Sequence, residues 1–275
     1  MYERKPWLKF YGGIPEQIGY PRVTMYEALM QTVSRNPDAA AYDFFGHAAT
    51  YGGFAAEIDR CADALSSLGL KRGDRITISM PTCPQGIISF YAVNKLGAVA
   101  SMIHPLYPAK EIAFYLQTAG SRFALTLDAF YGKFREVAGQ SGLETLILCR
   151  IPDYLPWIKR IGFRLTKGRK IRPVPKDDRM VVWWNDLMKR SWPPAPKADM
   201  GTDEMAVILF SGGTTGVPKG VMLTHENFCS NVKSALDLVP FGPGDHHLSF
   251  LPLCHSFERM AGYTATLAAG ARISF

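Results

Sequence analysis

Residues 208–220 read Ile-Leu-Phe-Ser-Gly-Gly-Thr-Thr-Gly-Val-Pro-Lys-Gly. An apolar strand leads into a loop of glycines and hydroxyl side chains, and a lysine follows the loop. Glycines let backbone N–H groups turn toward an anion, hydroxyl groups donate hydrogen bonds to phosphate oxygens, and a lysine adds a mobile positive charge. The loop therefore predicts a phosphate-binding site.

The spacing within the loop excludes the commonest alternative, a Walker phosphate loop. That motif needs a lysine followed by serine or threonine at the start of a helix, whereas here Pro218 precedes Lys219 and Gly220 follows it. Residues 221–224 have the pattern of a second short strand, so we expect the loop to join two strands. An ordinary glycine-rich turn is the other interpretation, but turns seldom combine three hydroxyls with a lysine.

The same stretch resembles the phosphate-binding signature of the adenylate-forming superfamily, which includes acyl-CoA synthetases, aryl-CoA ligases, luciferases and peptide-synthetase adenylation domains. Gly212 stands where a second hydroxyl residue often occurs, a variant similar to bacterial long-chain fatty acyl-CoA synthetases. The resemblance implies that Lys219 offsets charge as pyrophosphate leaves ATP. It also implies that backbone amides and hydroxyls hold the β- and γ-phosphates, from Ser211, Gly212, Gly213, Thr214, Thr215 and Gly216.

A second block, residues 251–259, reads Leu-Pro-Leu-Cys-His-Ser-Phe-Glu-Arg. In the family a strand that ends in Pro-x-x-His places an imidazole beside the carboxylate being activated, and His255 matches that position. Phe257 is expected nearby, where it would border the substrate. An imidazole suits this place because it can donate a hydrogen bond without carrying a permanent charge. Taken alone, a histidine after an apolar strand is more often a structural residue.

The rest of the chain alternates between helical and strand patterns. Apolar residues at helical spacing run from Tyr51 to Leu68 and stop at Gly69, and the strand Arg75–Met80 follows. The alternation continues with a helix near 85–96, a strand at 99–103, a helix after Pro108, a strand at 123–127, a helix near 129–138 and a strand at 146–149. This order predicts a layered α/β fold with mostly parallel sheets covered by helices. His104, at a position where the family usually has Asn, is assigned no catalytic role.

The resemblance also predicts the domain organisation. Residues 1–23 form a lead-in, and residues 24–275 form an incomplete N-terminal adenylation domain with a basic insertion at 154–176. The aromatic-Gly-x-Thr-Glu motif, the ribose-binding aspartate, the hinge and the C-terminal domain with its catalytic lysine are not found in the sequence. The chain also stops inside an expected strand at 271–275. We therefore expect a piece of an acyl-activating enzyme that does not turn over by itself.

Composition and residue spacing argue against several other classes of protein. The chain has 275 residues, of which 47% are hydrophobic, enough for a substantial core. No apolar segment follows Met1-Tyr-Glu-Arg-Lys as a signal peptide would require, and the apolar run 86–103 is broken by Asn94 and Lys95. The five cysteines lack any Cys-x-x-Cys pair, so neither a disulfide scaffold nor a zinc site is expected. The spacing of His246, His247, His255 and Glu258 fits no standard metal site either.

The net charge of +7 is concentrated in one segment. Residues 154–176 contain no acidic residue and eight basic ones, namely Lys159, Arg160, Arg164, Lys167, Arg169, Lys170, Arg172 and Lys176. On a helical wheel Trp157, Ile158, Ile161 and Leu165 share one face with cations beside it. Two interpretations stay open: a helix in an anionic lipid interface, or a solvated basic face over a packed apolar stripe. Nucleic-acid binding is not expected, because no recognised motif accompanies the charge.

The function expected from these features is ATP-dependent activation of a fatty acid to an acyl-adenylate and then to acyl-CoA. ATP with Mg²⁺ and coenzyme A would be the co-substrates, and we expect a cytoplasmic protein, in one interpretation peripheral on the inner membrane face. The alternatives are a non-catalytic module that binds nucleotide or acyl groups, an aryl-CoA ligase, or a peptide-synthetase adenylation domain. Neither acyl chain length nor the acceptor can be derived from the sequence.

Overall fold

The structure of the chain is a computed structural model that describes residues 5–211, 216–239 and 241–275. Its helices are η1 (Pro6–Phe10), α1 (Met25–Arg35), α2 (Tyr51–Ser67), α3 (Pro84–Lys95), α4 (Ala109–Ala119), η2 (Asp128–Phe130), α5 (Tyr131–Ser141), η3 (Ile151–Tyr154), α6 (Trp157–Leu165), η4 (Lys167–Lys170), α7 (Trp184–Lys189), α8 (His225–Leu238), η5 (Glu258–Ala265) and α9 (Thr266–Ala269). Its strands are β1 (Ala40–Phe44), β2 (His47–Thr50), β3 (Arg75–Ser79), β4 (Val99–Met102), β5 (Phe123–Leu127), β6 (Thr145–Cys149), β7 (Val181–Trp183), β8 (Met205–Ser211), β9 (Lys219–Thr224), β10 (His246–Leu248) and β11 (Arg272–Ser274).

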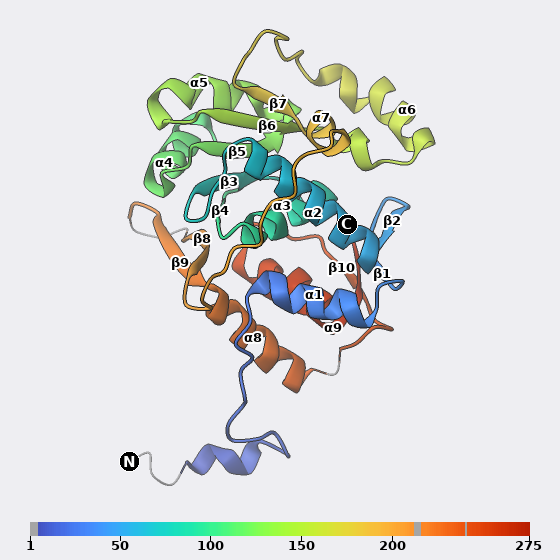
Figure 1. The fold of residues 1–275 in the computed structure, drawn as a ribbon, viewed down its shortest axis with the longest axis vertical. Coiled ribbons are helices and arrows are strands. Elements are labelled where there is room, and N and C mark those ends of the chain that lie inside the picture. The colour runs from blue at the N-terminus through green and yellow to red at the C-terminus, as the bar shows by residue number, and fades with distance from the viewer. Residues whose placement is uncertain (1–4, 212–215, 240) are drawn as a thin grey trace.

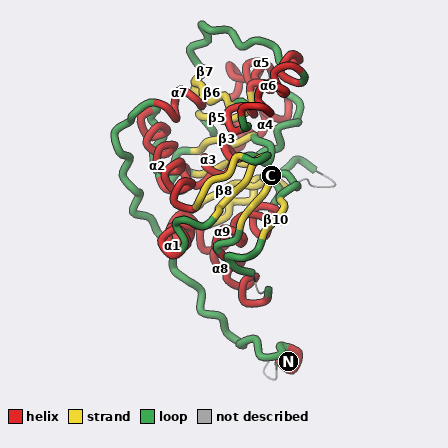
Figure 2. The backbone as a smooth tube through the Cα atoms, turned by 90° about the vertical axis from the view of Figure 1, so that its right-hand side faces the viewer, coloured by secondary structure: helices red, strands yellow, loops and turns green. Residues whose placement is uncertain are grey.

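The strands form two sheets (Figures 1 and 2). The larger sheet has seven strands in the order β7-β6-β5-β3-β4-β8-β9, and all of its pairings are parallel except that of β8 with β9. The smaller sheet has the order β10-β11-β1-β2, in which β11 runs parallel to both of its neighbours. The predicted layered α/β fold with mostly parallel sheets is therefore confirmed.

Helices cover both faces of the larger sheet, as the side chains of β5 and β6 show. Phe123, Leu125 and Ile147 point into the main core, which also contains residues of α2 and α3. Ala124 and Leu146 point the opposite way, into a second cluster with α4 and α5. Successive side chains of a strand face opposite sides, so a strand buried on both sides must be apolar along its whole length.

Helix α3 lies in the middle of the molecule (Figure 1), and every residue from Pro84 to Asn94 is buried. Buried side-chain donors of this helix bond to the backbone: Ser89 Oγ donates to Gly86 O at 3.1 Å, and Asn94 Nδ2 donates to Phe90 O at 2.9 Å. These bonds satisfy donors that would be costly if left unpaired. A helix that is buried all round explains why the run 86–103 is apolar without forming a membrane span.

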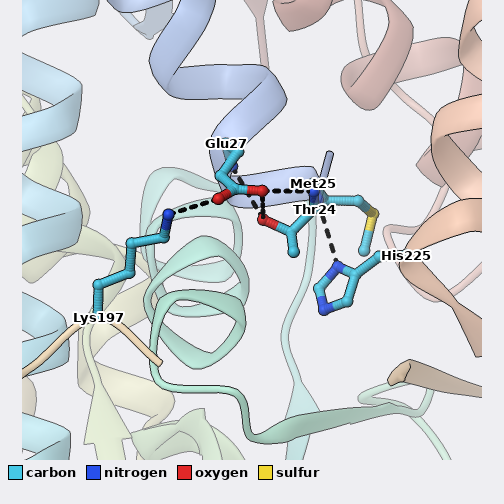
Figure 3. Close-up of polar contacts among 5 residues, drawn as sticks. All are labelled: Thr24, Met25, Glu27, Lys197 and His225. Atoms are coloured by element: carbon cyan, nitrogen blue, oxygen red, sulfur yellow. Dashed lines mark hydrogen bonds and ion pairs between the residues drawn. The ribbon is translucent and has the colours of Figure 1, made fainter. Parts of the chain in front are cut away.

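Polar contacts fasten α1 to α8 at the start of each helix (Figure 3). Thr24 and Glu27 form a reciprocal capping box at the start of α1, and Lys197 donates to Glu27. The backbone N–H of Met25 donates to Nδ1 of His225 at 3.2 Å. His225 is buried, and burial lowers its pKa to about 4. The imidazole is therefore neutral at pH 7 and acts as an acceptor.

The expected elements between residues 51 and 149 are all present, with ends that differ by at most a few residues. The helix expected near 129–138 is displaced, because η2 occupies 128–130 and α5 runs from Tyr131 to Ser141. The strand expected at 271–275 is β11. The helix pattern in 157–165 is α6, but its apolar side is exposed, so the interpretation of a packed apolar stripe is wrong.

Candidate active site

The two strands around the phosphate loop pair with each other at the edge of the larger sheet. Strand β8 and strand β9 are antiparallel, with Ser211 opposite Lys219 and Phe210 opposite Gly220. A Cβ atom at Gly220 would lie 3.1 Å from Cγ2 of Ile208 and 3.3 Å from the ring of Phe210, so a glycine permits this close pairing. The prediction that the loop joins two strands is confirmed.

The predicted phosphate-binding residues are only partly described. Gly212, Gly213, Thr214 and Thr215 lie outside the described residues. Gly216 and Lys219 are exposed at the exit of the loop, and Lys219 is the first residue of β9. The hydroxyl of Ser211 is exposed at the end of β8 and donates to the backbone O of Lys219 at 3.4 Å.

A cavity of about 660 Å³ opens at the carboxyl ends of β4 and β8. Its lining consists of Met102, Ile103, His104, Tyr107, Leu209, Phe210, Ser211, Val221, Leu223, Pro252, Cys254, His255 and Ser256. Ser211 and His255 are 44 positions apart in sequence but line this one cavity, as the resemblance implied. In parallel α/β sheets, ligands bind outside the carboxyl ends of the strands, which makes this cavity the candidate active site.

His104, which was assigned no catalytic role from the sequence, and Tyr107 also line the cavity. Nδ1 of His104 accepts a hydrogen bond from the backbone N–H of Leu106 at 3.2 Å, and the ring lies edge-on to Tyr107. The signal for both residues was their position directly after β4, since β4 runs parallel to β8 and ends at the same edge of the sheet. The role of His104 remains a prediction.

His255 lies in a turn and not at the end of a strand. Strand β10 ends at Leu248, so the expected strand running into Pro252 is wrong. A proline lacks the backbone N–H that a ladder needs, and the chain turns here with the N–H of His255 bonded to Pro252 O at 2.9 Å. Leu253 is buried against α3, where a Cβ atom at Gly86 would approach within 2.8 Å of it.

The side chain of Arg259 stabilises this turn. Its side chain is fully buried, with the guanidinium donating to Leu253 O and to the hydroxyl of Tyr263, and it lies 4.5 Å from the ring centre of Phe90. Its backbone N–H bonds to His255 O at 3.0 Å. Burial lowers the pKa of Arg259. Arg259 is part of η5, a π-helix, a kind of segment that is often found at functional sites.

A smaller cavity of about 290 Å³ adjoins the first one. It is lined by Leu209, Leu223, Asn227, Phe228, Asn231, Ser256, Phe257 and Met260, of which Leu209, Leu223 and Ser256 also line the larger cavity. The structure therefore places Phe257 in a cavity that shares Ser256 with the candidate active site. Most of this lining is apolar, so the smaller cavity suits a hydrocarbon group.

The comparisons with known proteins identify the family of the chain. Residues 29–275 match the family described as AMP-binding enzyme, and the chain belongs to that family. It is 32% identical over 237 residues to a long-chain-fatty-acid–CoA ligase of Bacillus subtilis (strain 168), a match that covers 85% of this chain and 42% of the relative. The chain thus spans less than half the length of this relative.

Solved structures share the fold. A long-chain-fatty-acid–CoA ligase from Archaeoglobus fulgidus superposes with a TM-score of 0.77 at 18% identity, over 94% of this chain and 48% of that one. ATP-bound MatB from Rhodopseudomonas palustris superposes with a TM-score of 0.75 at 21% identity, over 93% of this chain and 45% of that one. At these identities the likeness is evidence of fold alone.

Proposed function

We propose that this chain is the nucleotide- and acid-binding part of an AMP-forming fatty acid–CoA ligase. The observation that carries the proposal is that Ser211, at the start of the phosphate loop, and His255 line one cavity at the carboxyl edge of a parallel sheet. In the proposed reaction a carboxylate oxygen attacks the α-phosphorus of ATP and pyrophosphate leaves. The thiol of coenzyme A then attacks the acyl carbonyl and releases AMP.

The residues of the loop act by position and charge. The amides and hydroxyls of residues 211–216 hold the β- and γ-phosphates, and Lys219 offsets charge as pyrophosphate departs. His255 borders the place where carboxylate meets α-phosphate. Mg²⁺ enters with the nucleotide: no carboxylate occurs among the described residues that line the larger cavity, so its ligands there would be phosphate and water oxygens.

The acyl chain occupies the smaller cavity in this proposal. Leu209, Leu223 and Met260 form its apolar walls, and Phe257 is 61% exposed at its edge. Because both cavities share Ser256, a fatty acid could place its carboxylate near His255 and its chain near Phe257. The apolar lining supports a fatty acid as the substrate, and an aryl-CoA ligase is the alternative.

A second candidate function is a binding module without turnover. The match covers 42% of the Bacillus subtilis relative, so the activity of that whole relative is not carried over to this chain without a test. ATP–pyrophosphate exchange with a fatty acid separates the two functions. Exchange supports a ligase, and nucleotide binding without exchange supports the module.

The domain boundary and location belong to the same proposal. We place the adenylation domain at residues 24–275, with residues 1–23 as a lead-in and a basic insertion at 154–176. The protein would work in the cytoplasm, where ATP and coenzyme A are available. No helix among the described residues is long and apolar enough to cross a membrane.

The decisive test of the loop is the affinity for Mg²⁺-ATP measured by calorimetry. Replacing Lys219 by alanine removes a charge-assisted contact, so we expect affinity to fall about tenfold to a hundredfold. Lys110→Ala is the matched control, since Lys110 is also exposed and has no ion pair among the described residues. Unchanged affinity in the Lys219 variant would contradict the proposed phosphate site.

A further inference from the structure

Helix α6 exposes its apolar side to solvent instead of burying it. None of its nine residues is buried, and Trp157, Ile158, Ile161 and Leu165 are 71%, 65%, 50% and 56% exposed. The opposite side packs on the protein through Phe163, which contacts the main core. Exposed apolar side chains in a contiguous row on a helix mark a surface that something else covers.

The β1–β2 turn adds an exposed aromatic side chain beside α6. Phe45 is 53% exposed in a left-handed backbone conformation with φ 54°, and Lys159 of α6 donates to its backbone O at 2.7 Å. The lysine also lies over the Phe45 ring at 5.7 Å. We call the five exposed side chains, Phe45 with Trp157, Ile158, Ile161 and Leu165, the α6 ridge.

A cationic cavity of about 690 Å³ lies behind the α6 ridge, between α6, η4 and the edge of the larger sheet. The charged residues in its lining are Arg150, Arg160, Arg164, Arg172, Lys176 and Lys189, against Asp128 and Asp153. Both acids have partners already: Asp128 pairs with Arg150 at 3.7 Å, and Asp153 accepts from Nδ2 of Asn185 at 2.6 Å.

The other cations of this cavity have no such partner. Among the described residues, Arg164, Arg172, Lys176 and Lys189 form neither an ion pair nor a side-chain hydrogen bond. Four unpaired cations facing one cavity create a local field that favours an anion such as a phosphate group.

We propose that the α6 ridge and this cavity dock the protein on a membrane surface that contains anionic phospholipids. The ridge enters the boundary between headgroups and acyl chains, and Arg164, Arg172 and Lys176 contact lipid phosphates. An apolar face beside a dense row of cations is the pattern of helices that lie in the membrane interface. A soluble polyanion would satisfy the cations but would leave the aliphatic side chains of the ridge in water.

The α6 ridge lies away from the candidate active site, so docking through the ridge would not cover that cavity. In Figure 1, α6 lies at the outer edge of the molecule beyond β7. Strands β6, β5 and β3 separate β7 from β4 and β8, and the larger cavity opens at the carboxyl ends of β4 and β8. Membrane docking and ligase activity are therefore independent inferences, and either one can fail alone.

Vesicle flotation of the full chain tests the proposal. We expect it to float with vesicles of phosphatidylcholine and phosphatidylglycerol, to stay behind with phosphatidylcholine alone, and to be released by salt. Trp157→Ser combined with Ile161→Ser should weaken binding about tenfold or more, because the ridge loses its largest apolar groups. Arg164→Ala and Arg172→Ala should each weaken it about fivefold.

Matched controls separate docking from general effects. Leu238→Ser removes an aliphatic side chain that is 59% exposed on α8, and Lys110→Ala removes an exposed cation on α4. Both variants should bind vesicles like the parent, and every variant should keep the parent's circular dichroism and its affinity for Mg²⁺-ATP. A Trp157→Phe variant should lose the blue shift of tryptophan emission that the anionic vesicles cause in the parent.

Three results would overturn the proposal. The first is equal binding of the ridge variant and the parent. The second is equal binding to vesicles with and without phosphatidylglycerol. The third is a parent that binds inorganic phosphate but ignores both kinds of vesicle, since the cavity would then serve a soluble anion.

Discussion

The two edges of the larger sheet use their side chains in opposite ways. At the β9 edge, a loop and a turn place a few polar groups around a cavity, and buried contacts beneath them fix the backbone, as Arg259 does for the turn before His255. At the β7 edge, α6 has no buried residue, and it places several cations and several apolar side chains on the surface. A catalytic site must hold its side chains in fixed positions, so it needs a rigid, buried support. A surface that contacts fluid lipid needs only the right kinds of side chain facing outward.

The largest effect that would sharpen this contrast is expected at Arg259. Arg259→Ala leaves a cavity and removes the donors to Leu253 O and Tyr263, so we expect the free energy of unfolding in urea to fall by about 3 to 5 kcal/mol. Arg169→Ala is the control at the other edge, because Arg169 is exposed and should change stability by less than about 0.5 kcal/mol. Equal losses in both variants would erase the contrast.

The next effect concerns pH and the start of α8, directly after β9. His225 has a folded pKa of about 4 against an ordinary value of 6.5, so the unfolded chain binds the proton more readily between these values. The contribution of His225 to the free energy of unfolding is fully present above pH 6.5. It is lost as the pH falls toward 4, by about 3 kcal/mol in total.

Urea unfolding at several pH values measures this loss. His225→Asn keeps an acceptor for the Met25 N–H and removes the titration, so its stability should decline less between pH 7 and pH 4 than that of the parent. Parallel declines in the two proteins would show that His225 is not held neutral by burial.

The smallest effect is expected at the β7 edge. Trp157→Ser should change the free energy of unfolding by less than about 0.5 kcal/mol, since the side chain is 71% exposed. Trp184→Ser, at a tryptophan of α7 that is 2% exposed, should lose about 3 kcal/mol or more. Thermal unfolding of the two variants gives the comparison, and a large loss for Trp157 would mean that α6 belongs to the core.

Local patterns were sufficient for the parallel part of the fold. The helix of Tyr51–Ser67 ends before Gly69, which has φ of 95° and so suits only a glycine, and this stop signal is visible in the sequence. Strands buried on both faces, such as Phe123–Leu127, are apolar runs between turn residues and are equally visible.

Features that depend on contacts between residues far apart in the sequence could not be predicted from it. The turn before His255 follows from the bond of Arg259 to Leu253 O, and nothing in the local pattern specifies a buried arginine. His104 and Tyr107 join the cavity only because β4 pairs with β8 across a hundred positions of sequence. The α6 ridge faces outward because Phe163, on the other side of the helix, packs against the main core. A helical wheel does not show which side of a helix packs against the protein.

The order of the strands in the smaller sheet has a consequence for synthesis on the ribosome. The hydroxyl of Tyr51 donates to Ala271 O at 2.7 Å, 220 positions later, and β1 pairs with β11 over a similar distance. The β1–β2 hairpin therefore emerges long before its partner and waits with an open edge. Closing so long a loop is slow, so the part of the chain that is made first is among the last to reach its native contacts.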